Sequence, residues 1–151
     1  MRVIDGDLLE LALAGEFDVI VHGCNCHCTM GAGIAKSIKA RFPEAYAADL
    51  ATSKGDRDKL GTSSFAEIGR LHHSLVVVNA YTQYDWRGPG KKADYDAIRT
   101  AMQFVKKRFG GKRIGYPLIG AGLAGGDWNE IAPIIDMALN GEDHTLVRYA
   151  P

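Results

Sequence analysis

Hydrophobic residues occur along the chain in two patterns, short continuous runs and segments with helical spacing. The runs at residues 75–81 (LVVVNAY) and 19–21 (VIV) predict strands that are buried on both faces. Residues 93–109 predict a helix that ends at a Gly-Gly pair, because their apolar side chains recur every three or four positions. The same criteria predict further strands at residues 1–4, 62–68, 114–119 and 145–149, and further helices at residues 8–14, 31–41, 43–52 and 128–139.

Predicted strands and helices alternate along the whole chain. This order is typical of an α/β fold, and it predicts a three-layer α/β/α architecture with a central mixed, largely parallel sheet. The chain has 151 residues and no linker or low-complexity segment, so we expect one domain spanning residues 1–151. A chain of this size buries about 70% of its unfolded surface on folding, so it needs no disulfide or structural metal for stability.

Charge and cysteine content narrow the possible partners. The chain carries 18 basic and 18 acidic residues, and this balance argues against a bulk nucleic-acid partner, which requires a basic excess. No apolar run approaches the roughly 20 residues of a membrane helix, so we expect no membrane association. Three cysteines are an odd count for a disulfide framework, and no signal peptide opens the chain, so we expect a cytoplasmic protein. We also expect a monomer.

Two glycine-rich segments follow predicted strands and lead into predicted helices. Residues 30–35 (MGAGIA) and 119–124 (IGAGLA) nearly repeat each other. Ligands of open α/β sheets bind at the carboxyl ends of the strands, where such loops emerge. Neither segment contains Lys or Arg, so a bound anion would be held by backbone N–H groups and a helix N-terminus. One such loop would be explained by tight packing of helix on strand, whereas the pair indicates an anion site.

Two other segments resemble a cofactor motif and a metal motif, but neither meets the full pattern, so we expect no cofactor and no metal. Residues 120–125 match the dinucleotide pattern G-x-G-x-x-G, but only one helix and one strand are predicted after them, too few for the usual βαβ unit. Residues 22–28 (HGCNCHC) lack the paired C-x-x-C spacing of zinc sites. We therefore expect reduced thiols near the ligand, with a nucleophilic cysteine as an open alternative.

Four segments, taken in order, resemble the macrodomain family. They are Gly6 to Leu9, Val21 to Ala35 with Asn25, Val78 to Ala80, and Pro117 to Trp128. The resemblance covers essentially the whole chain. It extends to the branch that contains ADP-ribose 1''-phosphate phosphatases and O-acyl- and glutamyl-ADP-ribose hydrolases, and it implies ADP-ribose or a derivative as ligand, free or attached to a protein.

The resemblance also implies the roles of individual residues. Asp7, with Leu8 beside it, matches the acid that accepts a hydrogen bond from the adenine amino group. It could also cap a helix, and the two roles can coexist only if one carboxylate oxygen stays free. Asn25 matches the asparagine that binds the distal ribose, and Tyr149 is the candidate for stacking on adenine. The diphosphate would be held by Gly31, Ala32, Gly33, Ile34, Ile119, Gly120, Ala121, Gly122 and Leu123.

The resemblance defines the catalytic residues less closely. Members that act on glutamyl-ADP-ribose or DNA use a lysine in the loop after the central strand, but residues 81–86 (YTQYDW) contain none. Ala124 stands where the former group has an aspartate. Our candidate catalytic residues are therefore Asn25, Asp85 and Asp127, with His27 as the nearest histidine.

The acids have structural alternatives, and two functions stay open. Asp127 could cap the last helix as part of a D-x-x-E capping box, and Asp85 could be a solvated loop residue. The first function is hydrolysis, without a metal, of ADP-ribose 1''-phosphate or an ADP-ribose ester. The second is a non-catalytic module that reads or sequesters ADP-ribose.

Overall fold

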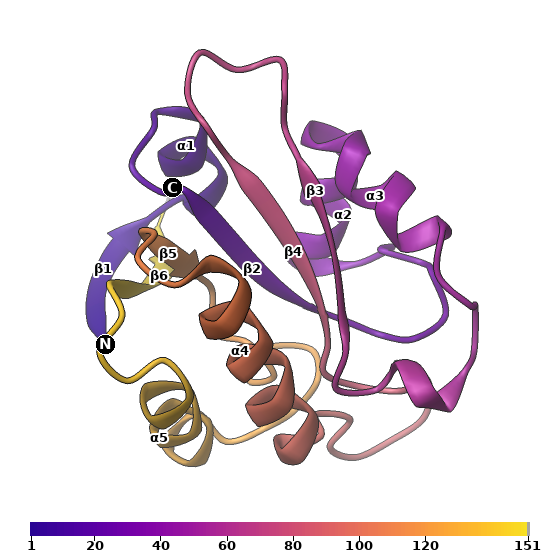
Figure 1. Ribbon diagram of the computed structural model, residues 1–151. Coiled ribbons are helices and arrows are strands. Elements are labelled where there is room, and N and C mark those ends of the chain that lie inside the picture. Colours follow the sequence, from indigo (N-terminus) through magenta and orange to yellow (C-terminus); the bar gives the residue numbers. More distant parts are fainter. Residues whose placement is uncertain (151) are drawn as a thin grey trace.

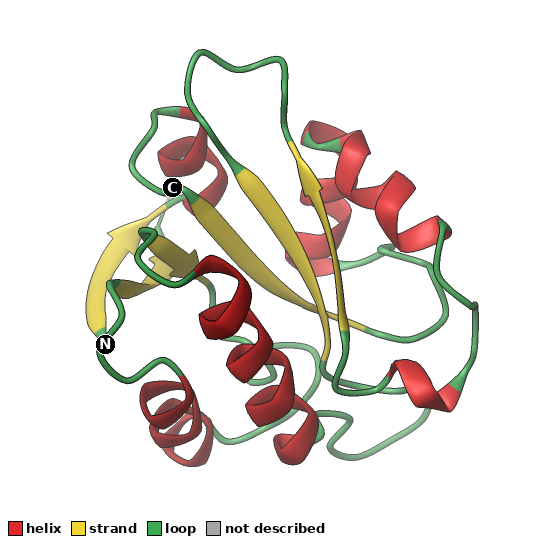
Figure 2. Cartoon of the chain, in the orientation of Figure 1, coloured by secondary structure: helices red, strands yellow, loops and turns green. Residues whose placement is uncertain are grey.

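A computed structural model describes residues 1–150 and shows a six-stranded sheet flanked by helices (Figures 1 and 2). The strands are β1 (Arg2–Gly6), β2 (Val19–Cys24), β3 (Ser63–Glu67), β4 (Val76–Tyr81), β5 (Ile114–Tyr116) and β6 (His144–Tyr149). The helices are α1 (Leu8–Leu13), α2 (Gly33–Arg41), α3 (Pro43–Leu50), α4 (Tyr95–Phe109) and α5 (Trp128–Ala138), and a short 3-10 helix spans Arg57–Lys59.

The sheet is mixed and mostly parallel, as predicted. Its strand order is β1-β6-β5-β2-β4-β3, and every neighbouring pair is parallel except β3 with β4. Parallel strands all point the same way, so the loops that follow β1, β2, β4 and β5 leave from one edge of the sheet. Because β2 and β5 are neighbours, the two glycine-rich loops lie next to each other at this edge.

Two hydrophobic cores lie on opposite faces of the sheet. Helices α4 and α5 cover one face, and α1, α2 and α3 cover the other (Figure 1). Successive side chains of a strand point to opposite faces. On β2, accordingly, Val19 and Val21 pack in the α4–α5 core, and Ile20 packs in the other. The predicted three-layer α/β/α architecture is confirmed.

Some element boundaries differ from the prediction. β1 continues through Asp5 and Gly6, because it pairs with β6 along its whole length. β5 ends at Tyr116 rather than residue 119, since Pro117 has no N–H for the sheet. α4 begins at Tyr95 rather than Ala93, because the side chain of Asp94 accepts a hydrogen bond from the Ala97 amide and caps the helix.

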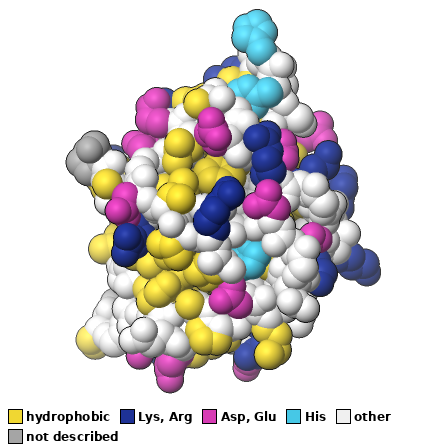
Figure 3. Space-filling model, turned by 90° about the vertical axis from the view of Figure 1, so that its left-hand side faces the viewer, with side chains coloured by type: hydrophobic (Ala, Val, Ile, Leu, Met, Phe, Trp, Pro, Cys, Tyr) yellow, Lys and Arg dark blue, Asp and Glu magenta, His cyan; other side chains and the backbone are white. Residues whose placement is uncertain are grey.

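The surface beside the β1 edge carries mixed side chains. In Figure 3, hydrophobic groups lie among acidic and basic ones on this face. Val3 and Met137 are among the exposed large hydrophobic residues. Within residues 1–150, no helix is long and apolar enough to cross a membrane.

Gly115 on β5 provides a test of the packing in the centre of the sheet. A Cβ at this position would lie 2.9 Å from three ring atoms of the buried Phe17. We expect Gly115→Ala to lower the free energy of unfolding by about 1–3 kcal/mol, the usual cost of overpacking, as measured by urea denaturation. The matched control is Gly69→Ala, whose Cβ would meet no atom within 4 Å, and it should leave stability unchanged. Equal stability of the two variants would contradict this packing.

Candidate functional site

A cavity of about 970 Å³ opens at the sheet edge where the loops after the parallel strands emerge. This volume lies in the range of small-molecule and cofactor sites. Its lining comes from both glycine-rich loops, the start of α1, the loop after β4 and the end of β6. The cavity therefore collects residues from the whole length of the chain.

Both glycine-rich loops line this cavity. Of the residues predicted to hold a diphosphate, Ala121 alone is outside the lining. The two loops approach each other across the cavity, because a Cβ on Gly33 would lie 3.4 Å from the Leu123 Cδ1 atom. The loop residues in the lining are Gly31, Ala32, Gly33, Ile34, Ile119, Gly120, Gly122 and Leu123.

Among the helix starts at this edge within residues 1–150, only that of α2 is not capped by a side chain. α1, α4 and α5 also follow parallel strands, and they are capped by Asp7, Asp94 and Asp127. The N-cap position of α2 is Ala32, which has no side-chain hydrogen bond to offer. The first amides of a helix need an acceptor, and together with the helix dipole they favour an anion. Hence the first glycine loop presents unsatisfied donors to the cavity.

The second glycine loop is closed by a backbone hydrogen bond. The Gly126 amide donates to the Gly120 carbonyl at 2.7 Å. A Cβ on Gly126 would lie 2.6 Å from that carbonyl oxygen, and Gly120 has a φ of +75°. Both positions therefore require glycine, which explains why this segment is so rich in it.

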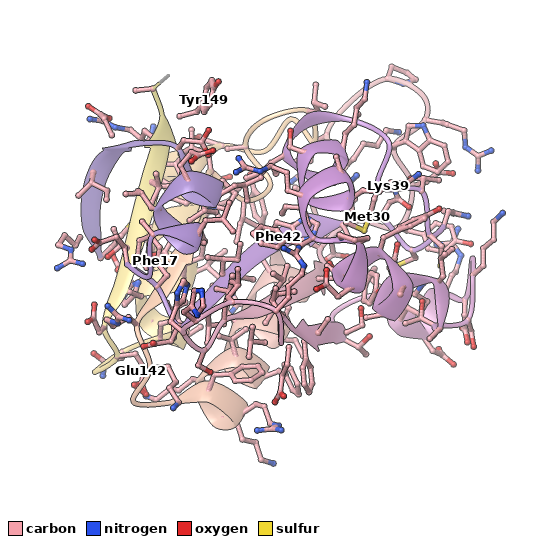
Figure 4. All side chains as sticks on the ribbon, turned by 90° about the horizontal axis from the view of Figure 1, so that it is seen from above. Phe17, Met30, Lys39, Phe42, Glu142 and Tyr149 are labelled. Carbon is pink, nitrogen blue, oxygen red and sulfur yellow. The ribbon has the colours of Figure 1, made fainter. Side chains whose placement is uncertain are left out.

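Asp7 and Tyr149 lie together at one end of the cavity. The Asp7 Oδ1 atom accepts hydrogen bonds from the Leu9 and Glu10 amides, at 2.9 and 3.2 Å, and caps α1. No residue within 1–150 donates to its Oδ2 atom, so the capping role leaves one oxygen for a ligand. Tyr149 is 75% exposed and pairs in register with Gly6. In Figure 4 it lies at the upper edge of the view, well apart from Met30 of the first loop.

Asn25, which precedes the first glycine-rich loop in the sequence, also lines the cavity, and two hydrogen bonds fix the orientation of its side-chain amide. Its Oδ1 atom accepts a hydrogen bond from the His27 amide at 2.8 Å, and its Nδ2 atom donates to the Thr29 hydroxyl at 2.7 Å. The turn is tight, because Cys28 and Met30 have positive φ values of 57° and 41°. This turn holds the Asn25 side chain at the cavity wall.

Neither predicted catalytic acid lines the cavity. Asp85 forms a two-pronged ion pair with Arg87, which holds the pKa of the carboxyl well below its usual range. Its Oδ2 atom is also 3.9 Å from the His27 Nε2 atom. Asp127 accepts a hydrogen bond from the Asn129 amide at 2.9 Å and caps α5. The structure thus does not bring either acid to the cavity beside Asn25.

The structure places one carboxylate in the lining that the sequence did not single out. Asp49, on α3, is 1% exposed, and its Oδ1 atom accepts a hydrogen bond from the Tyr81 hydroxyl at 2.7 Å. Burial raises the pKa of Asp49, while the bond from Tyr81 and the charge of Lys59 oppose that rise. The available signal was its spacing, since Asp49 follows the buried Phe42 and Ala45 on the core-facing side of α3.

Gln83 and Trp86 also line the cavity, and neither was among the predicted site residues. Both belong to the loop after β4. Trp86 is 45% exposed, and its ring contacts the edge of the His27 ring at a centroid distance of 5.7 Å. Their position after a parallel strand was the only sequence signal for them.

The cysteines are buried and paired with local groups. Burial raises the pKa of Cys24, and it raises that of Cys26 to about 11, so the thiolate form that a nucleophile needs is disfavoured. The Cys28 thiol donates to the Asp49 carbonyl at 3.2 Å. Over residues 1–150, no three His, Cys, Asp or Glu side chains are arranged to hold a metal ion.

Comparison with known proteins agrees with this geometry. The family model for the Macro domain matches residues 21–135, which include both glycine-rich loops. The chain belongs to the macrodomain family. The macrodomain is 35% identical, over 156 residues, to a phage T4 protein of 17.5 kDa that is itself uncharacterized, and the match covers 100% of this chain and 97% of the relative.

Two further relatives carry named activities. The DNA ADP-ribosyl glycohydrolase of Mycobacterium tuberculosis is 29% identical over 126 residues, which cover 83% of this macrodomain but 35% of that protein. The ADP-ribose 1''-phosphate phosphatase of Candida albicans is 27% identical over 139 residues, 86% of this chain and 88% of the relative.

Solved structures show the same fold. The macrodomain of Mycobacterium tuberculosis DarG superposes with a TM-score of 0.75 at 23% identity, covering 99% of this chain and 97% of the other. Thermosipho africanus DarTG in complex with ADP-ribose gives a TM-score of 0.76 at 17% identity, covering 99% and 41%. The expected macrodomain fold is confirmed.

The buried His22 makes the stability of this macrodomain pH-dependent. Burial lowers its pKa to about 4, although a hydrogen bond to Asn79 opposes the shift. Between pH 6.5 and pH 4, His22 is protonated in the unfolded chain but stays neutral in the folded protein. The free energy of unfolding therefore falls as the pH falls. The expected loss is about 3 kcal/mol for a shift of this size.

The substitution His22→Gln isolates this contribution. We expect the difference in unfolding free energy between wild type and variant to shrink by about 3 kcal/mol from pH 7 to pH 4, measured by urea denaturation. The pKa of His144 is also lowered, but this residue is present in both proteins and cancels. Parallel pH curves for the two proteins would show that His22 is not the source.

Proposed function

We propose that this macrodomain binds ADP-ribose along the cavity and hydrolyses a derivative at the distal ribose, such as ADP-ribose 1''-phosphate or an ADP-ribose ester. One observation carries the proposal. A single cavity is lined by Asp7 at one end, by both glycine-rich loops and by the Asn25 side chain. The proposal requires no metal and no cofactor.

The chemistry of each part fits a part of ADP-ribose. A carboxylate oxygen suits the adenine amino group, and an exposed tyrosine ring suits the face of the base. Uncapped amides at α2 suit the diphosphate without any side-chain cation. The named activities of the glycohydrolase and phosphatase relatives support the same ligand.

For the reaction, we assign Asn25 to orient the distal ribose. Hydrolysis also needs a group that positions water and a group that protonates the leaving oxygen. Asp85 and His27 are our candidate pair beside the cavity, and their side chains lie 3.9 Å apart. The His27 amide donates to Asn25, and Trp86, the neighbour of Asp85 in the sequence, lines the cavity. Asp127 has no part in this proposal, because its carboxylate caps α5.

A second candidate function is ADP-ribose binding without turnover. It is favoured because both predicted catalytic acids already have other partners. Asp85 forms an ion pair with Arg87, and Asp127 caps α5. The loop after β4 also carries Gln83 and no lysine up to Trp86. In that case the site would recognise free ADP-ribose or ADP-ribose attached to a protein.

Asp7→Asn tests the binding site separately from the fold. Asparagine caps helices as well as aspartate does, so thermal stability should stay the same. Loss of the charged acceptor for the adenine amino group should weaken ADP-ribose binding about tenfold, measured by isothermal titration calorimetry. The control Asp7→Ala should lose both stability and affinity. If Asp7→Asn bound ADP-ribose as tightly as wild type, the adenine end would be wrongly assigned, and absence of any wild-type binding would refute the proposed function.

Turnover separates the two candidate functions. Wild type should release phosphate from ADP-ribose 1''-phosphate or acetate from O-acetyl-ADP-ribose, and Asn25→Ala should be about 100-fold slower, since misplacing a substrate costs that much. Asp7→Asn should change KM more than kcat, because it lies at the opposite end. ADP-ribosylated peptides belong in the same assay. A wild type that binds ADP-ribose but turns over none of these compounds is a binding module.

A further inference from the structure

The Asp49 carboxylate has an oxygen that no donor satisfies. Its Oδ1 atom is bonded to Tyr81, whereas its buried Oδ2 atom has no hydrogen-bond partner within residues 1–150. The side chain is 1% exposed and lines the cavity. A buried carboxylate oxygen without a donor is costly, and a group that supplies one is strongly favoured.

Asp49 belongs to the end of the cavity that lies away from Asp7 and Tyr149. Its partner Tyr81 ends β4, while Tyr149 ends β6, and β5 and β2 lie between those strands. Three strand spacings correspond to about 14 Å, roughly 4.8 Å each. Asp49 also lies beneath the turn that carries Asn25, because its backbone carbonyl accepts a hydrogen bond from Cys28.

A directed chain of hydrogen bonds fixes the carboxylate. His22 Nε2 donates to Asn79 Oδ1 at 2.6 Å, and Asn79 Nδ2 donates to Ser64 Oγ at 3.0 Å. The Ser64 and Tyr81 hydroxyls are 2.8 Å apart, and Tyr81 donates to Asp49. Because Tyr81 uses its proton on Asp49, Ser64 must donate to Tyr81, so every donor in the chain points toward the carboxylate. The chain satisfies Oδ1 and leaves Oδ2 as an acceptor.

We propose that Asp49 is a specificity-determining residue, whose Oδ2 atom accepts a hydrogen bond from a hydroxyl group of the distal ribose. This inference rests on the proposed ADP-ribose site and adds a residue to it. The hydroxyls of a ribose are donors, and a carboxylate in a desolvated site is a strong acceptor for them. Asp49 therefore distinguishes ADP-ribose from ADP, which fills the adenine and diphosphate positions but lacks the distal sugar.

The test measures ADP-ribose and ADP binding to wild type and to Asp49→Asn by isothermal titration calorimetry. Asparagine keeps the shape and the acceptor for Tyr81 but replaces the free oxygen with an N–H₂ donor. We expect ADP-ribose to bind about tenfold more weakly to the variant, as for loss of a hydrogen bond to a charged group, and ADP to bind within about twofold of wild type. The control Asp96→Asn makes the same substitution at an exposed acid of α4 that does not line the cavity, and it should leave both affinities within about twofold.

Each other result overturns the inference in a distinguishable way. Equal weakening of ADP and ADP-ribose would mean that Asp49 supports the whole cavity, and unchanged ADP-ribose affinity would mean that the ligand does not reach it. If wild type bound neither compound, the proposed function itself would fail. If Asp49→Asn did not fold, Tyr81→Phe would replace it in the test, because this variant removes the hydroxyl that orients Asp49. It should weaken the binding of ADP-ribose but not that of ADP. An equal effect on both ligands, or no effect, would refute the inference as well.

Discussion

The parallel pairing of β2 with β5 and β4 in the middle of the sheet is the constraint on which the site depends. β2 and β5 are far apart in sequence, yet Val19 pairs with Ile114 in register. That pairing places one glycine-rich loop beside the other, and the pairing of β2 with β4 sets the loop after Tyr81 against the turn that holds Asn25. Since these contacts are non-local, the cavity exists only when the whole sheet has formed.

Helix capping divides the amides at this edge between structure and ligand. Four helices begin there, and in three of them an aspartate caps the first turn by accepting a hydrogen bond from a backbone amide. α2 alone starts without a side-chain acceptor, at the loop that faces the cavity. An anion can therefore be held by backbone dipoles in a chain with no net charge and no cation in either glycine-rich loop. The aspartates also keep the other three helix starts from competing for it.

The sequence predicted what depends on local pattern and chain order. Alternating strands and helices led to the layers, and the repeated loops led to the cavity wall. Boundaries moved where pairing or capping intervened, as at Gly6 and Asp94. The hydrogen-bond partners of polar side chains could not be predicted as well, because they depend on the folded structure. Asp127 accepts a hydrogen bond from a helix amide, and Asp85 pairs with Arg87. Asp49 was overlooked because it lies within an ordinary helix, and only the tertiary contact with Tyr81 gives it meaning.

The buried polar chain from His22 to Asp49 gives the cavity a chemical direction. Hydrogen bonds in a low-dielectric interior reinforce one another when they point the same way, and here each donor points toward the carboxylate. Donors thus gather at the glycine-rich loops and an acceptor lies at the far end. A ligand that matches this order carries its negative charge in the middle and hydroxyl groups at its end. This polar chain begins at His22, whose burial lowers its pKa and makes the stability of the fold pH-dependent. The stability of the fold and the polarity of the cavity therefore depend on the same buried network.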